Sequence, residues 1–232
     1  MGPVAQVASV TGMTGLTLLI LLLAGLPLVL LSPSLRRERW LALALLALLP
    51  AGWGFGAWQL ALPKTPDTEL SLRIVQPNVP QSDKWRSENA RMIFDRLQEL
   101  SLAPTADRPA GLAGIDYLIW PESAVPFLID ESPVARDEIA RMLNGKGVLL
   151  TGSIRREAQS GDTPARVFNS IIAFDGRGDV VARYDKWRLV PGGEFLPFEW
   201  LLEPLGFRKV VTVPGSFAAG PGPQTLQLPG GL

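Results

Sequence analysis

The chain has 232 residues, with 22 basic and 22 acidic side chains and a formal net charge of zero. Proteins that bind nucleic acid through their charge usually carry a basic excess, so this class is disfavoured. The sequence contains neither Cys nor His. Disulfides, thiolate or imidazole metal sites and a Ser-His-Asp triad are therefore excluded within it. Acid–base chemistry in this chain has to use Asp, Glu, Lys or Tyr.

Two long apolar stretches lie near the N-terminus. The segments from Met13 to Leu31 and from Trp40 to Leu62 contain no charged residue. About 20 helical residues span a hydrocarbon core of roughly 30 Å. We therefore expect two transmembrane helices, at about 13–31 and 40–62, in a membrane region that covers residues 1–63. Two buried core helices are the alternative explanation.

A short basic loop separates these two stretches. Arg36, Arg37 and Arg39 outnumber Glu38, so the positive-inside rule places the loop in the cytoplasm. Both helices then end on the outer side of the membrane, and the chain after Leu62 is expected to face the periplasm or the cell exterior. The N-terminus lacks the basic region and the cleavage site of a signal peptide, so we expect the middle of a multi-span protein.

After the membrane region, apolar periodicity predicts alternating strands and helices. Ser132 followed by Pro133 is typical of a helix start, and Gly176-Arg177-Gly178 is typical of a hairpin turn. The order is that of an α/β sandwich with a mixed sheet, in a domain over residues 64–232. The expected strands are 70–76, 116–120 and 148–153, the helices 87–102 and 132–144, and the hairpin 168–184.

One candidate for acid–base chemistry follows the second strand. Trp120-Pro121-Glu122 lies at the C-terminal end of that strand, where open α/β sheets form their ligand crevices. A carboxylate in this place should be partly desolvated, which raises its pKa and suits it to act as a general base. An exposed loop carboxylate beside a turn proline is the alternative.

A second candidate segment follows the hairpin. Lys186 ends Tyr184-Asp185-Lys186, and Glu194 follows in Gly193-Glu194-Phe195. A Lys at a strand end supplies a fixed positive charge where an oxyanion develops. A solvated surface Lys is the alternative, which the neighbouring Glu194 makes less favourable.

In combination, these segments resemble the nitrilase (carbon–nitrogen hydrolase) superfamily. Trp120-Pro121-Glu122 is similar to the segment that holds the catalytic Glu of that superfamily, and Tyr184-Asp185-Lys186 is similar to the segment that holds its catalytic Lys. The residues of these segments are most similar to those of the membrane-embedded apolipoprotein N-acyltransferase family. The two apolar stretches agree with this family, because most other relatives of nitrilase are soluble. Gly192 departs from that family, which usually has an aromatic residue there. Further agreeing segments are 76–78, 80–85, 151–152 and 168–170.

The resemblance implies a nitrilase-like αββα sandwich, incomplete in this chain, and specific residue roles. Glu122 is implied to be the general base, and Lys186 to stabilise the tetrahedral intermediates. Glu194 is implied to orient Lys186 or the substrate. Trp85 is implied to lie near the lipid substrate, with a hydrophobic plug under its loop as the alternative. No metal and no cofactor are implied.

The implied reaction is a two-step acyl transfer. An acyl chain passes from a phospholipid to a Cys thioester, and then to the N-terminal diacylglyceryl-cysteine of an apolipoprotein. The implied Cys lies beyond Leu232, so we expect a chain that is truncated at both ends and inert alone. The implied location is the bacterial inner membrane, multi-pass, with the catalytic domain in the periplasm and no nucleic-acid partner. A membrane-anchored nitrilase-type amidase and a non-catalytic membrane-binding module are the alternatives.

An apolar segment follows the second candidate segment. Residues 195–202, with Leu205 and Phe207, are unusually apolar for a loop beside a catalytic site. Exposed apolar patches of this kind often mark contact with a membrane or lipid. Core packing of a short helix is the alternative.

The orientation can be tested with a reporter fused after Lys64. We expect the reporter to be extracytoplasmic, because Arg36, Arg37 and Arg39 hold their loop inside. The measurement is a paired assay with one reporter active only outside and one active only inside. A cytoplasmic signal would overturn the orientation.

Overall fold

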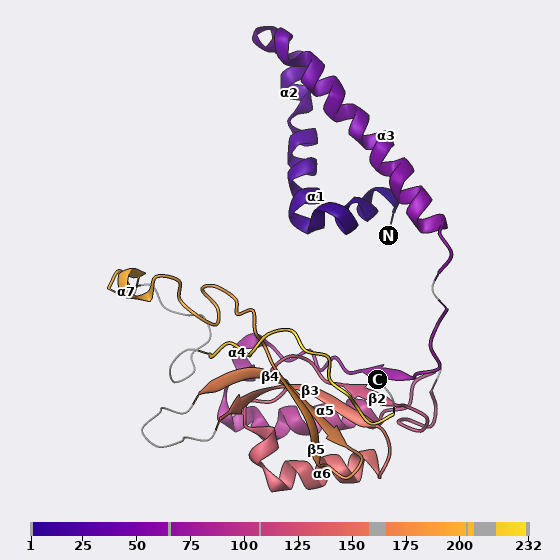
Figure 1. Cartoon of the computed structure of the whole chain (residues 1–232), viewed down its shortest axis with the longest axis vertical. Helices are drawn as coiled ribbons and strands as arrows, with labels where there is room; N and C mark the ends of the chain where they lie inside the picture. Colours follow the sequence, from indigo (N-terminus) through magenta and orange to yellow (C-terminus); the bar gives the residue numbers. More distant parts are fainter. Residues whose placement is uncertain are drawn as a thin grey trace. The chain divides into compact units, whose positions relative to one another are not determined.

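The computed structural model describes residues 2–64, 66–106, 108–157, 166–202, 204–206 and 217–230. The chain divides into two compact units, Met1–Thr68 and Glu69–Leu232 (Figure 1). Phe207 and the start of the Gly- and Pro-rich stretch at Val210, where no helix is expected, lie outside the described residues.

The first unit is entirely helical. Two helical stretches, Pro3–Leu31 and Pro33–Ala61, are each 29 residues long and apolar enough to cross a membrane. The backbone leaves the helical conformation at Gly12 in the first stretch and at Leu35 in the second. Only 6% and 11% of their most apolar windows are buried, so their leucines are largely exposed, unlike those of buried core helices. The stretches consist of η1 (Pro3–Val7), α1 (Ala8–Ala24), α2 (Leu26–Leu31), η2 (Pro33–Glu38) and α3 (Arg39–Ala61).

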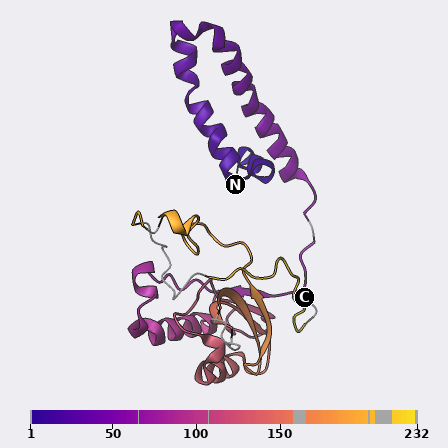
Figure 2. The ribbon, with the colours of Figure 1, turned by 60° about the vertical axis from the view of Figure 1, so that its left-hand side comes forward.

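Close packing joins the two helical stretches. η1 and α2 both contact α3, and Figure 2 shows the helices side by side. A side chain at Gly56 would collide with the backbone of Pro3, so the glycine permits this approach. The first stretch begins earlier than expected, because the uncharged residues from Pro3 onward are also helical, up to a kink at Gly12.

The second unit is built on one mixed sheet. Its strand order is β1-β2-β3-β4-β5, with β1, β2 and β3 parallel and both later pairs antiparallel. The expected mixed sheet is therefore confirmed. The strands are β1 (Leu72–Ile74), β2 (Tyr117–Ile119), β3 (Val148–Arg156), β4 (Val167–Asp175) and β5 (Val180–Asp185).

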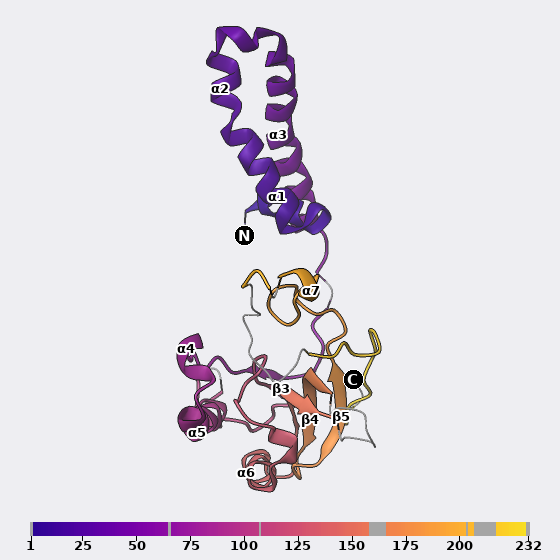
Figure 3. The same ribbon diagram turned by 90° about the vertical axis from the view of Figure 1, so that its left-hand side faces the viewer.

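Helices cover one face of this sheet, as Figure 3 shows for α5 and α6. Each of these helices links two parallel strands, which need a long crossover. Ile93 and Leu97 of α5 and Ile139 of α6 pack with Leu149 and Ile172 in the main core. The helices are α4 (Gln81–Lys84), η3 (Ser87–Asn89), α5 (Ala90–Leu102), η4 (Ile129–Glu131), α6 (Pro133–Leu143) and α7 (Glu199–Leu202).

Local signals place the ends of α6. The Ser132 hydroxyl accepts a hydrogen bond from the backbone N–H of Ala135 at 3.3 Å, and Asn144 ends the helix in the left-handed conformation. Both predicted ends are confirmed. β3 is longer than predicted because it pairs with β4 along its whole length, from Val148 to Arg156, well beyond its parallel pairing with β2.

The opposite face of the sheet has a different cover. Tyr117 and Val148 form a second, smaller cluster there with Leu228, and the Tyr117 hydroxyl donates to the carbonyl of Pro229 at 2.9 Å. In the second unit, the described residues thus form one helical layer on one face of the sheet. Part of segment 217–230 lies on the opposite face.

Truncation of Leu149 should destabilise the second unit. Leu149 is 0% exposed, so Leu149→Ala leaves a cavity that costs about 2–5 kcal/mol of unfolding free energy. The measurement is denaturant unfolding of the whole chain in detergent, followed by circular dichroism. Leu72→Ala is the matched control, because Leu72 is 54% exposed. Equal losses in both variants would contradict this core.

Candidate active site

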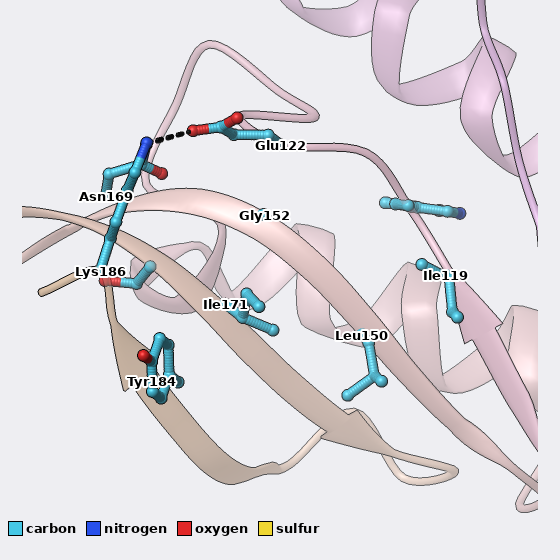
Figure 4. A pocket seen from close by; sticks show the side chains of 10 residues that line it. Ile119, Glu122, Leu150, Gly152, Asn169, Ile171, Tyr184 and Lys186 are labelled. Carbon is cyan, nitrogen blue, oxygen red and sulfur yellow. Dashed lines mark hydrogen bonds and ion pairs between the residues drawn. The ribbon is translucent and has the colours of Figure 1, made fainter. Parts of the chain in front are cut away.

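Polar side chains from one strand and from three segments that follow strands meet at one end of the sheet. Glu122 follows β2, Asn169 lies on β4, Lys186 follows β5, and Glu194 lies in the loop after it. Figure 4 shows Glu122, Asn169 and Lys186 converging there. The predicted Glu122, Lys186 and Glu194 are therefore brought together.

The Lys186 ammonium lies between the two carboxylates. Its Nζ is 3.3 Å from Oε1 of Glu122 and 3.0 Å from Oε1 of Glu194. Burial alone would lower the pKa of Lys186, but the hydrogen bond and charge of Glu194 and those of Glu122 raise it above its ordinary value of 10.5. Lys186 therefore stays positively charged at neutral pH.

Asn169 completes a ring with these three groups. Its Nδ2 donates to the same two carboxylate oxygens, at 2.5 Å to Glu122 and 2.7 Å to Glu194. Asn169 is buried, and one amide group thus fixes both carboxylates around Lys186. No role was predicted for Asn169 from the sequence. Its signal was the agreement of segment 168–170 with the family that the chain resembles, which implied no specific role for Asn169.

Glu194 is held by its own loop. Its side chain is 7% exposed, and Oε2 accepts from the backbone N–H of Val190 at 2.8 Å. Burial alone would raise the pKa of Glu194. Hydrogen bonds from Asn169, the Val190 N–H and Lys186 hold it below its ordinary value of 4.5.

The backbone conformation explains why Gly192 occupies a position where the resembled family usually has an aromatic residue. Its φ is +76°, in the left-handed region where a residue with a Cβ is strained. The backbone N–H of Gly192 also donates to the carbonyl of Phe195 at 2.7 Å, which closes the loop around Glu194. The glycine therefore suits the turn that presents Glu194.

The expected desolvation of Glu122 is wrong for the described structure. Its side chain is 65% exposed. The chain leaves the sheet after β2, and Figure 4 shows the Glu122 carboxylate directed toward Lys186 and away from Ile119 and Leu150. Glu122 is the open member of the ring, while Glu194 is the enclosed one.

The backbone of Glu122 is fixed although its carboxylate is exposed. A Cβ on Gly152 would come within 2.5 Å of the Glu122 Cα, so this glycine lets β3 pass directly beneath the loop. The backbone N–H of Ala124 donates to the Gly152 carbonyl at 2.8 Å. Lys84 Nζ donates to the Glu122 carbonyl at 3.0 Å.

Trp85 lies next to that Lys84 contact. It follows α4 and is 38% exposed, so the described core does not enclose it. No hydrogen bond or ion pair within the described ranges joins Trp85 to Glu122, Lys186 or Glu194. The structure therefore leaves its predicted role in substrate binding as a prediction.

A pocket of about 370 Å³ opens beside the ring (Figure 4). Its rim carries Glu122, Asn169 and Lys186, and its walls are almost entirely apolar. These walls are formed mainly by Ile119, Leu150, Ile171 and Tyr184.

No group of three or more acidic side chains in the described part of the chain could hold a metal ion.

A second apolar surface surrounds α7. We call Phe198, Trp200, Leu201 and Leu205 the α7 patch; they are 70%, 76%, 47% and 66% exposed. Core packing is therefore the wrong explanation for these four side chains. The patch follows directly after the loop that holds Glu194.

Comparison with known proteins defines the class. A family model described as carbon-nitrogen hydrolase matches residues 71–231. The match covers most of the chain, including all four members of the ring. The chain belongs to the carbon–nitrogen hydrolase family, which confirms the resemblance and the nitrilase-like fold.

Within the carbon–nitrogen hydrolase family, the chain is similar to curated apolipoprotein N-acyltransferases. The chain is 38% identical over 209 residues to an apolipoprotein N-acyltransferase of Allorhizobium ampelinum, covering 88% of the chain and 39% of the relative. It is 42% identical over 171 residues to one of Brucella suis biovar 1, covering 72% and 31%. The predicted similarity to this family is confirmed. The chain spans between about a third and two fifths of the length of these relatives.

Solved structures show more distant similarity. An amidase from Nesterenkonia sp. AN1 is 16% identical, with a TM-score of 0.33, over 70% of this chain and 51% of that chain.

The pKa of Glu194 predicts a pH dependence of stability. A carboxyl with a lowered folded-state pKa contributes stability above its unfolded pKa, and this contribution is lost as the pH falls through the folded value. Glu194→Gln should therefore lower the melting temperature at neutral pH, and the difference should shrink below the ordinary value of 4.5. The measurement is thermal unfolding between about pH 3 and pH 8.

The matched control for this series is Glu88→Gln. Glu88 is 70% exposed in its pair with Arg86, and surface pairs contribute little. We expect no comparable change at any pH. A Glu194→Gln difference that stayed constant into acid would argue against the lowered pKa.

Proposed function

We propose that this chain supplies the membrane anchor and the Glu–Lys part of the active site of an apolipoprotein N-acyltransferase. The observation that carries the proposal is the Lys186 ammonium held between Glu122 and Glu194, at 3.3 and 3.0 Å. The similarity to curated apolipoprotein N-acyltransferases supports the reaction class.

The first proposed step forms a thioester. Glu122 accepts the proton of a cysteine thiol, which other residues must supply because this chain has no Cys. The thiolate attacks an ester carbonyl of a phospholipid, and the oxyanion develops beside the Lys186 ammonium. The ester C–O bond then breaks, and the lysophospholipid leaves with the proton from Glu122.

The second proposed step transfers the acyl chain. The α-amino group of a diacylglyceryl-cysteine at a lipoprotein N-terminus attacks the thioester. Glu122 takes a proton from this amine and returns it to the departing thiolate. Lys186 stabilises the second tetrahedral intermediate as it did the first. Glu194 keeps Lys186 in place through both steps.

The apolar surfaces support a lipid substrate over a small soluble amide. The two helical stretches would anchor the chain in the inner membrane, with the second unit in the periplasm. The α7 patch exposes two aromatic side chains, Phe198 and Trp200, beside the Glu194 loop. Trp85, partly exposed next to the Glu122 contact of Lys84, is proposed to touch the lipid.

The proposal is tested in a graft. The aligned part of this chain, 88% of its length, replaces the matching segment of the Allorhizobium ampelinum relative, and acyl-enzyme formation is measured with a labelled phospholipid. Glu122→Gln should slow this step by about 10²–10⁴-fold, because it keeps the shape of the side chain and removes the base. Lys186→Met should slow it by roughly 10²–10³-fold, because it removes the oxyanion stabiliser.

Lys146→Met is the matched control. Lys146 is exposed in the turn after α6, away from the ring, so the rate should not change. Membrane insertion and melting temperature are measured for every variant. If Glu122→Gln acylated at the control rate in a folded graft, Glu122 would not be the base.

A further inference from the structure

A charged cluster lies at the end of β5, on the opposite side of the chain from the Lys186 side chain that follows this strand. Successive side chains of a strand project to opposite faces. Lys186 projects toward Glu122 and Glu194, whereas Asp185 projects toward Arg155 of β3.

The Asp185 carboxylate accepts three short hydrogen bonds. Arg155 binds its carboxylate with two parallel hydrogen bonds, Nε to Oδ1 at 2.9 Å and Nη2 to Oδ2 at 2.7 Å. The Ser170 hydroxyl donates to Oδ1 at 2.6 Å. Paired bonds of this kind fix direction as well as distance. Asp185 therefore has little freedom to rotate.

The partner of Asp185 is itself fixed. The Arg155 guanidinium lies 4.5 Å from the ring centroid of Phe168, which is buried. The side chains of Arg155 and Asp185 are only 15% and 16% exposed. Burial alone would raise the pKa of Asp185, but Arg155 and Ser170 hold it below its ordinary value of 3.8. The pair is therefore charged at neutral pH.

The backbone links this cluster to the site. Ser170 and Asp185 are the last register partners of β4 and β5, and just beyond them the N–H of Lys186 donates to the Asn169 carbonyl at 2.8 Å. Two members of the ring thus directly adjoin two members of the cluster. The N–H of Gly220 also donates to the carbonyl of Lys186, at 3.0 Å.

We propose that Asp185, held by Arg155 and Ser170, is a positioning residue that aims Lys186 at both carboxylates. The strand ends at Asp185, so the cluster is the last side-chain anchor before the Lys186 stem. Without it, the β5 end can move and Nζ loses its contacts with Glu122 and Glu194. The catalytic consequence rests on the proposed function, whereas the positional effect does not.

The test measures the pKa of Lys186 by NMR in the whole chain in detergent micelles. The signal is its ¹³Cε resonance, assigned with Lys186→Arg. The contacts with Glu194 and Glu122 raise this pKa, so any variant that separates these groups should lower it. The variants are Asp185→Asn, Arg155→Gln and Ser170→Ala.

The signs of the shifts separate positioning from simple charge effects. If only charge mattered, Arg155→Gln would raise the Lys186 pKa, because it removes a nearby positive charge, and Asp185→Asn would lower it. Positioning predicts that both variants lower it, by roughly half a pH unit. Ser170→Ala changes no charge and should also lower it, by less. A rise in Arg155→Gln, or no shift in Ser170→Ala, would overturn the proposal.

Two controls keep the experiment decisive. Arg136→Gln breaks the exposed Arg136–Asp179 pair, 2.8 Å long, at the far end of β5 and should leave the Lys186 pKa unchanged. If Asp185→Asn and Arg155→Gln fail to fold, Ser170→Ala decides alone, because it removes one hydrogen bond only.

In the grafted acyltransferase, the variants of Asp185, Arg155 and Ser170 should lower kcat more than they raise KM. If the graft transfers no acyl chain, the proposed function fails while the NMR result stands.

Discussion

The arrangement of this site depends on one ammonium group placed between two carboxylates. Without Lys186, Glu122 and Glu194 would share Asn169 as two like charges that repel each other. With Lys186 present, the ring balances two negative charges with one positive charge and two amide hydrogens. The four side chains come from four separate places in the chain, so the order and register of the sheet determine whether the ring forms.

The sheet meets this requirement through backbone contacts that only particular residues allow. Gly152 lets the Glu122 loop rest on β3, and Gly192 takes a positive φ so that the next loop can return Glu194 to the site. Asn144 similarly ends α6 in the left-handed conformation before β3 begins. These positions carry no chemistry themselves, yet a side chain or a different φ at either glycine would move a carboxylate.

Much of this arrangement could be predicted from the sequence, because periodicity and capping act locally. Ser132, Pro133 and Asn144 mark both ends of α6, and the apolar runs mark β2 and β3. The place of Asn169 in the ring could not be predicted, since it depends on which strands pair and in which register. The exposure of Glu122 was predicted wrongly for a related reason. A strand-end position says where the backbone is, but not whether other groups cover the side chain.

The carboxylates of Glu122 and Glu194 differ most in their exposure to solvent, and this difference is the basis for the roles proposed for them. Glu122 is 65% exposed and Glu194 is 7% exposed, although both touch the same Nζ. A base has to reach a thiol and later an amine, and only the open carboxylate can exchange protons with incoming groups. The enclosed carboxylate, kept ionised by Asn169, the Val190 N–H and Lys186, is suited to hold a charge in place. In the proposed function, two chemically identical groups would thus take separate roles because of their surroundings alone.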